Sequence, residues 1–233
     1  MLGVVVALPW ELKSLTRETM PAGTWKALTP EILVVSSGIG AERAYEAGSV
    51  LIAHGANALL SWGYAAALDD RLKAGCLLLP ERVLGANGET YPVDAGWHRR
   101  LYRALESELP VCKDALVESA AVVKTPAEKR ALWCRTCAAG TDMESAAHAR
   151  AAEQHGLPFL AVRSILDTAS TDIPEAVLQA LDAEGNVDRA KLFIGACRAP
   201  ADWIKMARLA LKFRAAQRTL MKAKARVFDS SRF

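Results

Sequence analysis

The chain has 233 residues, of which 52% are apolar and 24% charged, and no apolar run reaches the ~18 residues that a membrane-spanning helix requires. This composition excludes a transmembrane protein and favours one large soluble domain, because the length suffices for a single core. The net charge is only +3, and the basic excess lies in the carboxyl-terminal tail. Elsewhere in the chain no aromatic residues interleave with basic ones as on a nucleic-acid surface, so we expect no nucleic-acid partner.

Residues 1–8 are apolar and carry neither a basic leader nor a small-residue cleavage site, so we expect a first strand in a cytoplasmic protein. The five cysteines are an odd number and widely spread, which favours free thiols. Cys134 and Cys137 form a C-x-x-C pair, but no second pair or paired histidines complete a zinc site. We therefore expect no metal and no resident cofactor.

The first predicted elements lead to an acidic residue at the edge of a sheet. The valine-rich run 3–7 is typical of a strand buried on both faces, and Pro9 suits the first turn of the helix that follows. Glu11 then lies at the carboxyl end of this strand, either as an acid favoured by the helix dipole or as a functional carboxylate. Residues 25–28 and 32–36 have the pattern of a hairpin.

A Gly-x-Gly turn, Gly38 to Gly40, follows this hairpin and precedes a predicted helix over 41–54. Such a turn lets backbone amides approach an anion. Arg43 occupies a position at which the dinucleotide-binding pattern requires a small residue, so a tight strand-to-helix turn is the simpler interpretation. Gly38, Gly40 and Arg43 are nevertheless candidates for a loop that holds a nucleophile or a phosphate.

The middle of the chain alternates predicted strands and helices. In order, these elements are a strand over 58–62, a small-residue loop over 63–68, a strand over 75–80, a helix over 97–109, a strand over 115–123 and a short helix from 126. Gly63 and Tyr64 begin the small-residue loop, which allows close approach to the backbone, and they join the nucleophile-loop candidates. The alternation predicts an α/β fold, a three-layer α/β/α sandwich with a mixed, mostly parallel central sheet.

The stretch 138–170 brings acidic residues from two elements to one edge of the predicted sheet. Asp142 and Glu144 open a predicted helix that ends near His155, and a buried strand over 159–165 then delivers Asp167 at its carboxyl end. Ligands of open α/β sheets bind beyond the carboxyl ends of the strands. We therefore expect a shared polar pocket suited to a small, polyhydroxylated molecule that contains nitrogen.

The last segment, 201–233, predicts a basic amphipathic helix that follows a catalytic domain over 1–200 and docks on it. Its apolar stripe comprises Met206, Leu209, Phe213, Ala216, Leu220, Ala223 and Val227, and the residues expected on the opposite side are Arg208, Lys212, Arg218, Lys222 and Arg226. This pattern is typical of a helix with a solvated outer face. The alternative is peripheral contact with an anionic membrane surface at the inner face of the membrane.

Taken in order, these motifs resemble the nucleoside phosphorylase and nucleosidase superfamily, and in length and motif order the chain is similar to the methylthioadenosine/S-adenosylhomocysteine nucleosidases. The matching segments are 3–12 (GVVVALPWEL), 37–40 (SGIG), 62–68 (WGYAAAL), 75–80 (GCLLLP), 141–147 (TDMESAA) and 162–170 (VRSILDTAS). The resemblance implies that the chain cleaves the N-glycosidic bond of a purine nucleoside and forms a homodimer.

The resemblance also implies roles for single residues. Asp167 matches the acid that protonates the purine, and Glu11 matches the base that activates the attacking water. Glu144 matches the acid that holds the ribose hydroxyls, with Met143 packing on the sugar. Val122 and Val123 fall near the segment that stacks on the base. Cleavage leaves positive charge on the sugar and negative charge on the base, so these acids suit the reaction.

Several positions depart from the nucleosidase pattern. A serine-containing loop is replaced by Gly63-Tyr64-Ala65, Leu166 replaces a serine before the catalytic acid, and Pro9 and Trp10 replace acids beside Glu11. These changes make the expected pocket more apolar. With the basic tail, they resemble the hopanoid-associated phosphorylases, which release adenine from adenosylhopane, so a lipid-linked adenine nucleoside is the expected substrate.

The nucleophile remains open at this point. Inorganic phosphate as co-substrate requires cationic or amide donors; Gly38, Gly40 and Arg43 can supply them, but the arginine that phosphorylases carry before the Gly63 loop is absent. Retention of Glu11 favours water. The alternatives to an adenosylhopane-cleaving enzyme are a methylthioadenosine/S-adenosylhomocysteine nucleosidase with an altered pocket and a nucleoside-binding protein without turnover.

Overall fold

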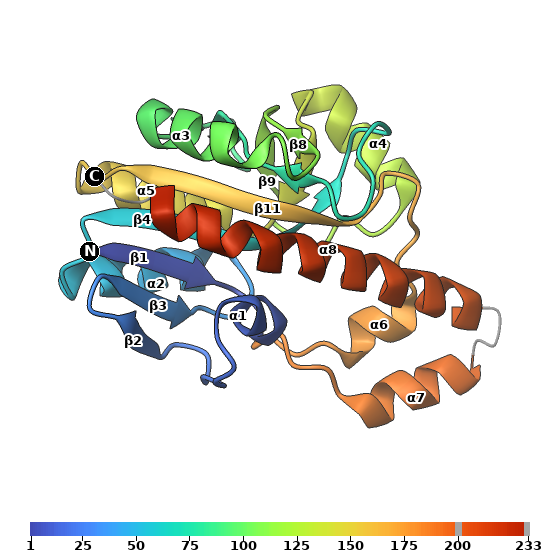
Figure 1. Ribbon diagram of the computed structural model, residues 1–233. Coiled ribbons are helices and arrows are strands. Elements are labelled where there is room, and N and C mark those ends of the chain that lie inside the picture. The colour runs from blue at the N-terminus through green and yellow to red at the C-terminus, as the bar shows by residue number, and fades with distance from the viewer. Residues whose placement is uncertain (199–201, 231–233) are drawn as a thin grey trace.

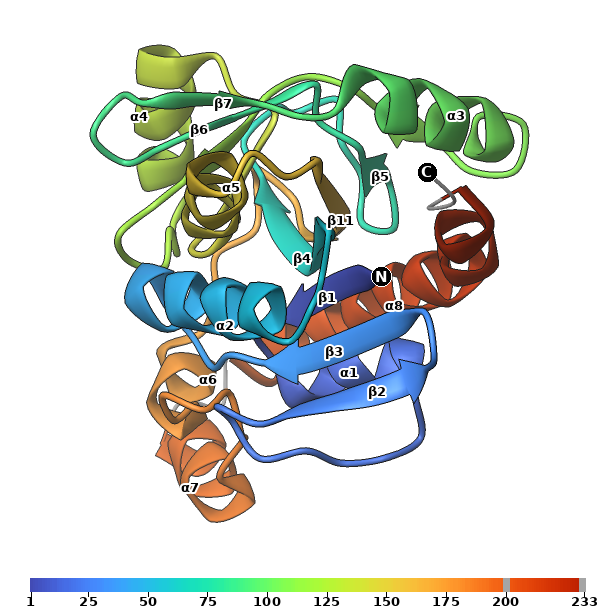
Figure 2. The same ribbon diagram turned by 90° about the vertical axis from the view of Figure 1, so that its left-hand side faces the viewer.

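The computed structural model describes residues 1–198 and 202–230 and has three layers (Figures 1 and 2). Helices α2 (Ala41–Ala53) and α5 (Ser145–Gln154) pack on one face of a central sheet. Helices α1 (Pro9–Leu15) and α8 (Asp202–Ser230) pack on the other face, and α3 (Ala95–Leu105) lies beside α8. The α/β/α sandwich expected from the sequence is confirmed.

The centre of the sheet consists of parallel strands. Strand β1 (Leu2–Val6) lies between β3 (Ile32–Ser36) and β4 (Ala58–Ala67), and β11 (Phe159–Asp167) runs parallel to β4. The remaining strands are β2 (Trp25–Thr29), β5 (Leu77–Leu78), β6 (Arg82–Leu84), β7 (Thr90–Pro92), β8 (Val111–Cys112), β9 (Leu116–Glu118) and β10 (Gly140–Asp142). Antiparallel pairs such as β2–β3 and β6–β7 make the sheet mixed.

The sheet branches at β4. The amino-terminal half of β4 pairs with β1, its carboxyl-terminal half pairs with β10, and β11 follows β4 along most of its length. The small-residue segment 63–68 was expected to be a loop, and this prediction was wrong, because residues 63–67 extend β4 between two partner strands. Pairing on both edges supplies the hydrogen bonds that the sequence pattern does not reveal.

Other boundaries also moved. The strands expected over 75–80 and 115–123 contain only Leu77–Leu78 and Leu116–Glu118, and the helix expected over 97–109 begins at Ala95, where Asp94 caps it, and ends at Leu105. The expected hairpin of β2 and β3 is confirmed. The expected helix start at Pro126 is confirmed too, since the Thr125 side chain accepts a hydrogen bond from the amide of Glu128 at the start of α4 (Pro126–Thr136).

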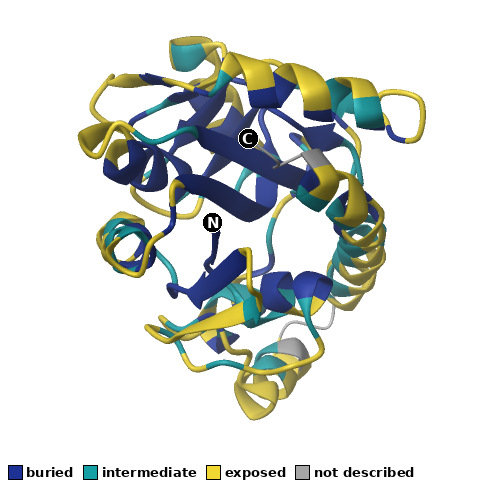
Figure 3. Ribbon diagram, turned by 60° about the vertical axis from the view of Figure 1, so that its left-hand side comes forward, coloured by how far each residue is buried: buried dark blue, intermediate teal, exposed yellow. Residues whose placement is uncertain are grey.

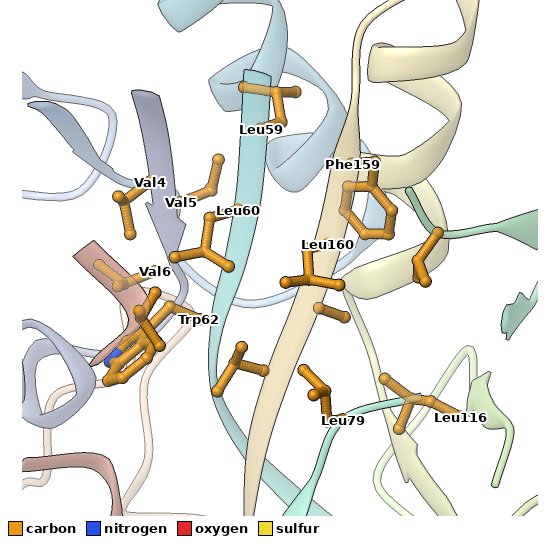
Figure 4. Close-up of a cluster of buried hydrophobic side chains, with 14 of the residues drawn as sticks. Val4, Val5, Val6, Leu59, Leu60, Trp62, Leu79, Leu116, Phe159 and Leu160 are labelled. Carbon is orange, nitrogen blue, oxygen red and sulfur yellow. The ribbon is translucent and has the colours of Figure 1, made fainter. Parts of the chain in front are cut away.

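The core is built from residues that alternate toward the two helical layers. Val4 and Val5 of β1, Leu60 of β4 and Leu160 of β11 are fully buried, and Figure 4 shows these side chains side by side. Burial on both faces explains why these strands are continuously apolar. Figure 3 shows the buried strands enclosed by helices that are exposed on their outer sides.

The carboxyl-terminal helix α8 lies along β11 and contacts α1 and α3 (Figure 1). Its predicted inward stripe is confirmed, since Ala216, Leu220 and Val227 are fully buried. The Thr219 hydroxyl also donates a hydrogen bond to the carbonyl of Gly75 (2.7 Å). The prediction for Lys212 was wrong: its ammonium donates hydrogen bonds to the hydroxyls of Thr168 and Thr171 on the inner side. The side chain is long enough to reach inward from the edge of the stripe.

Helices α6 (Glu175–Ala180) and α7 (Arg189–Arg198) pack against each other at the end of the molecule where α8 begins (Figure 1). Within the described ranges, none of the helices is long and apolar enough to cross a membrane. Those same ranges contain no cluster of histidine, cysteine and acidic side chains that could hold a metal ion.

Two leucines of α8 provide a matched test of how the helix contributes to stability. We predict that Leu220→Ala lowers the free energy of unfolding by about 2–5 kcal/mol, because it leaves a cavity in the core. Leu211→Ala changes the same free energy by less than about 0.5 kcal/mol, because Leu211 is 63% exposed. Urea unfolding of the full chain measures both values, and equal effects would show that α8 is not docked through this stripe.

Candidate functional site

Glu11 occupies the junction between β1 and α1. Pro9 fixes the first turn of α1 and leaves no amide to satisfy there, and the Glu11 side chain folds back over this turn. Its Oε2 accepts hydrogen bonds from the amides of Ala7 (2.8 Å) and Leu8 (2.9 Å), and its Oε1 accepts one from the amide of Tyr64 (2.8 Å). The carboxyl group is therefore buried and held rigidly at the carboxyl end of β1, as the sequence predicted.

Gly63 leaves the space in which Glu11 meets Arg163. A Cβ at position 63 would stand 2.0 Å from Oε1 of Glu11 and 2.9 Å from Nη1 of Arg163. Arg163 lies directly opposite Gly63 in the parallel pairing of β11 with β4. The Glu11 carboxyl group and the Arg163 guanidinium thus both lie next to the space that a side chain at position 63 would fill.

Arg163 is the centre of a buried polar network. Its Nε donates to Oδ2 of Asp142 (2.7 Å), and its Nη2 donates to the hydroxyls of Ser61 (2.7 Å) and Ser145 (3.0 Å). The Ser61 hydroxyl also lies 2.7 Å from Nδ1 of His148. Nη1 of Arg163 is buried and has no hydrogen-bond partner among the described protein atoms. One nitrogen of the guanidinium is therefore buried beside Glu11 without a hydrogen-bond partner among the described residues.

Glu144 lies at the start of α5 and faces the same network. Its Oε1 accepts a hydrogen bond from the amide of Gly40 (3.0 Å), and its Oε2 accepts one from the amide of Met143 (3.2 Å). Burial, followed by the negative charges of Asp142 and Glu11, raises the pKa of Glu144 to about 8. Burial also raises the pKa of Glu11, although the charge of Arg163 opposes this shift. The two carboxyl groups are close enough to interact electrostatically.

Asp167 ends β11 and forms a second polar group. The ammonium of Lys129, which is fully buried in α4, pairs with Oδ2 of Asp167 and donates to the carbonyls of Thr168 (3.0 Å) and Thr171 (2.9 Å). Burial raises the pKa of Asp167, and the charges of Lys129 and then Lys212 oppose this rise. The carboxyl group is thus buried with a cation in direct contact.

The two polar groups lie at opposite ends of one stretch of β11. Asp167 follows Arg163 by four residues, which is about 13 Å along a strand. Glu11 and Glu144 interact with Arg163 and with each other, whereas Asp167 interacts with Lys129 and Lys212.

Aromatic side chains border the Glu11 end. The ring of Phe213 from α8 contacts the ring of Tyr64 (centroids 5.6 Å apart) and the ring of Trp10 (6.3 Å). The hydroxyl of Tyr64 is buried without a hydrogen-bond partner among the described residues. These three rings give the site an apolar border to which the carboxyl-terminal helix contributes.

The other predicted site residues lie at varied distances from the carboxyl groups. Met143 is half-buried next to Glu144, while Val122 and Val123 line a cavity of about 780 Å³ between α4 and the β6–β7 hairpin. The carbonyl of Lys124 accepts a hydrogen bond from the amide of Ile173 (3.0 Å), which joins the Val122 segment to the loop after Asp167.

The Gly38–Gly40 turn is engaged by protein groups. The amide of Gly40 donates to Glu144, and the amide of Ile39 donates to the carbonyl of Ala183. The Arg43 guanidinium donates to the same carbonyl (3.0 Å) and contacts Glu184 (3.4 Å). Arg43 thus contacts the 183–184 turn, outside the network around Arg163.

Two central residues had no role assigned from the sequence. Arg163 lies inside one of the segments that resemble the nucleosidases. The sequence alone does not reveal the partners of a single arginine in an apolar strand, because these partners come from β4, β10 and α5. Lys129 lies in the second turn of α4, where a lysine usually faces solvent. No sequence signal pairs it with Asp167, which lies 38 residues away.

Comparisons with known proteins agree on the fold. Residues 2–196 match the family model described as the phosphorylase superfamily. Solved structures that superpose well include a methylthioadenosine/S-adenosylhomocysteine nucleosidase from Helicobacter pylori (18% identity, TM-score 0.72, covering 98% of this chain and 97% of that one). A futalosine hydrolase mutant from the same species (17% identity, TM-score 0.71, 98% of both chains) and a Neisseria meningitidis nucleosidase (16% identity, TM-score 0.71, 98% of both chains) are also similar. No curated protein matched.

The raised pKa of Glu144 predicts a pH-dependent stability. The folded protein retains a proton up to about pH 8 that the unfolded chain releases near the ordinary pKa of 4.5. The free energy of unfolding of the wild type, compared with that of Glu144→Gln, should therefore fall as the pH rises from 4.5 to about 8. The expected decrease is about 1.4 kcal/mol for each unit by which the pKa is raised. Urea unfolding at several pH values measures the difference, with the exposed Glu153→Gln as control. A difference that does not change with pH contradicts this assignment.

The Lys129 contact predicts a second titration effect. Lys129→Met keeps the apolar stem but removes the charge, so the pKa of Asp167 should rise further above its ordinary value. Carboxyl ¹³C NMR of aspartate-labelled protein measures this pKa, with the signal assigned by Asp167→Asn. Lys124→Met, an exposed change just before the same helix, serves as control, and Lys129→Arg tests whether a cation suffices. An unchanged Asp167 titration in Lys129→Met would refute the electrostatic role.

Proposed function

Because the chain belongs to the phosphorylase superfamily, we propose that it cleaves the N-glycosidic bond of an adenine nucleoside, with water as the nucleophile. The observation that carries this proposal is the pairing of two separate polar groups along β11. Glu11, Glu144 and Arg163 form one group, and Asp167 with Lys129 forms the other. A nucleoside between them has its sugar at the first group and its base at the second.

The Asp167 end suits the leaving base. Cleavage moves the bonding electrons onto the base, which must gain a proton or be stabilised as an anion. Asp167, with its pKa raised by burial, is the proton donor in this proposal, and the ammonium of Lys129 stabilises the negative charge that develops on the base. Both groups come from rigid elements, so little reorganisation is required at the moment of reaction.

The Glu11 end suits the sugar and the attacking water. The transition state carries positive charge on the ribose, which the carboxylate of Glu11 stabilises. Glu144, whose pKa burial raises to about 8, holds the ribose hydroxyls as the neutral acid. A water that donates to Glu11 can accept a hydrogen bond from Nη1 of Arg163, the unpartnered atom next to that carboxylate. Glu11 then takes the proton as the water oxygen bonds to the anomeric carbon.

Contacts of the Gly38–Gly40 turn support water over phosphate. A phosphate dianion requires several amide or cationic donors at once. The amide of Gly40 is already paired with Glu144, and Arg43 is paired with the 183–184 turn. The carboxylate of Glu11 would also repel an anion at this end.

The border of Trp10, Tyr64 and Phe213 supports a substrate with an apolar substituent on its sugar. We propose adenosylhopane, an adenosyl lipid, as the preferred substrate class. Methylthioadenosine and S-adenosylhomocysteine, with smaller or more polar substituents, are the alternative substrates. Adenine is the base released in each case.

An adenine-release assay tests the function. We expect release from an adenosyl lipid in detergent at a rate independent of added phosphate, with the ribosyl lipid as the second product and no sugar 1-phosphate. Faster release from methylthioadenosine would support the alternative substrate class. Bound nucleoside without free adenine from any of these substrates would contradict catalysis altogether.

Two substitutions test the roles of the acids. Asp167→Asn and Glu11→Gln should each lower the rate constant for adenine release about 10²–10⁴-fold, because each removes one proton-transfer group. Asp172→Asn is the matched control, since Asp172 is exposed, pairs with Lys205 and lies five residues after Asp167. Wild-type rates in Asp167→Asn would remove this residue from the mechanism.

A further inference from the structure

Helix α8 has a second face whose large side chains are exposed in the described part of the chain. Four large apolar side chains project from this face: Trp203, Ile204, Leu211 and Met221 are 50, 64, 63 and 58% exposed. Apolar side chains gathered on one exposed element mark contact surfaces more often than isolated ones do. The inner stripe of the same helix is already used for docking on the sheet.

The exposed residues follow the helical repeat. Five of the exposed residues recur every three or four positions, or at twice that interval, and therefore share one side of α8. They are Trp203, Leu211, Arg214, Arg218 and Met221. We call these five, together with Ile204, Arg208 and Lys222, the outer face of α8. All eight are exposed.

The charge on the outer face has one sign. Arg208, Arg214, Arg218 and Lys222 form no ion pair with any described residue. The sequence from Trp203 to Phe228 contains no acidic residue at all. The outer face therefore combines unneutralised cations with large apolar side chains.

Helix α7 carries two further exposed apolar side chains. Phe193 and Ile194 are 62 and 50% exposed, and α7 lies at the end of the molecule where α8 begins (Figure 1). Trp203 and Ile204 occupy the first turn of α8 at this same end.

We propose that the outer face of α8 docks on an anionic lipid bilayer, with Trp203, Ile204 and Leu211 entering the headgroup region. A helix that lies in the membrane plane requires apolar side chains to bury and cations to meet the lipid phosphates, and both are present on this face. The proposal does not depend on the enzymatic function, because lipid contact needs no nucleoside.

Other occupants fit this face less well. A second copy placed face to face would bring four cations against four cations without an acid to separate them. A nucleic acid would neutralise the cations but leave Ile204, Leu211 and Met221 in water, since aliphatic side chains offer little to phosphate or sugar. An anionic bilayer satisfies both the charge and the apolar area.

Vesicle flotation of the full chain tests the proposal. Binding is expected to vesicles of phosphatidylcholine with 30% phosphatidylglycerol (on the order of biological anionic content) and not to pure phosphatidylcholine, and it should weaken with added salt. Arg214→Gln with Arg218→Gln should lower the partition coefficient about 30-fold, equivalent to about 2 kcal/mol for two cations. Arg130→Gln with Arg135→Gln on α4 removes the same charge elsewhere and should leave binding unchanged.

The depth of Trp203 gives an independent readout. Brominated lipids should quench part of the tryptophan emission on binding, and Trp203→Phe should abolish that quenching while retaining flotation. No flotation with anionic vesicles, or equal losses in the α4 control, overturns the proposal. A dimer that forms with increasing protein concentration and is abolished by Leu211→Ser also overturns the proposal, because it assigns the outer face of α8 to a second copy of the chain. Nucleic-acid binding with the same residue dependence and no vesicle binding likewise overturns it.

Discussion

One buried guanidinium organises the Glu11 end of the site. Arg163 pairs with Asp142 and lies close enough to Glu11 and Glu144 to affect the protonation of each. Three buried acids without a cation would repel one another and keep their protons. Arg163 comes from β11, while the acids come from α1, β10 and the start of α5, so this interaction joins four separate parts of the chain.

The second buried cation has a different position and effect. Lys129 holds the carboxyl group of Asp167 and two carbonyls of the loop that follows β11. Lys212 and Phe213 reach the candidate site from α8, so the helix that the sequence suggested as a tail also contributes to this site. The proposed lipid-binding face and the site residues lie on opposite sides of this one helix.

The sequence predicted the fold and the acids better than it predicted their partners. Glu11, Glu144 and Asp167 were found because each follows a recognisable strand or opens a helix, and the structure places all three in buried positions. Lys129 and Lys212 escaped, since a lysine in an amphipathic helix looks solvated until the tertiary contact is known. The segment 63–67 was assigned to a loop because its small residues give no strand periodicity, although pairing with β10 and β11 makes it a strand.

Gly63 carries a consequence for how this protein can change over time. The Glu11 carboxyl group occupies the volume in which any side chain at position 63 would begin. A side chain at position 63 would therefore displace the Glu11 carboxyl group from its three amide donors, so the two positions constrain each other. The rigid placement of the acid depends on the absence of a side chain on a neighbouring strand.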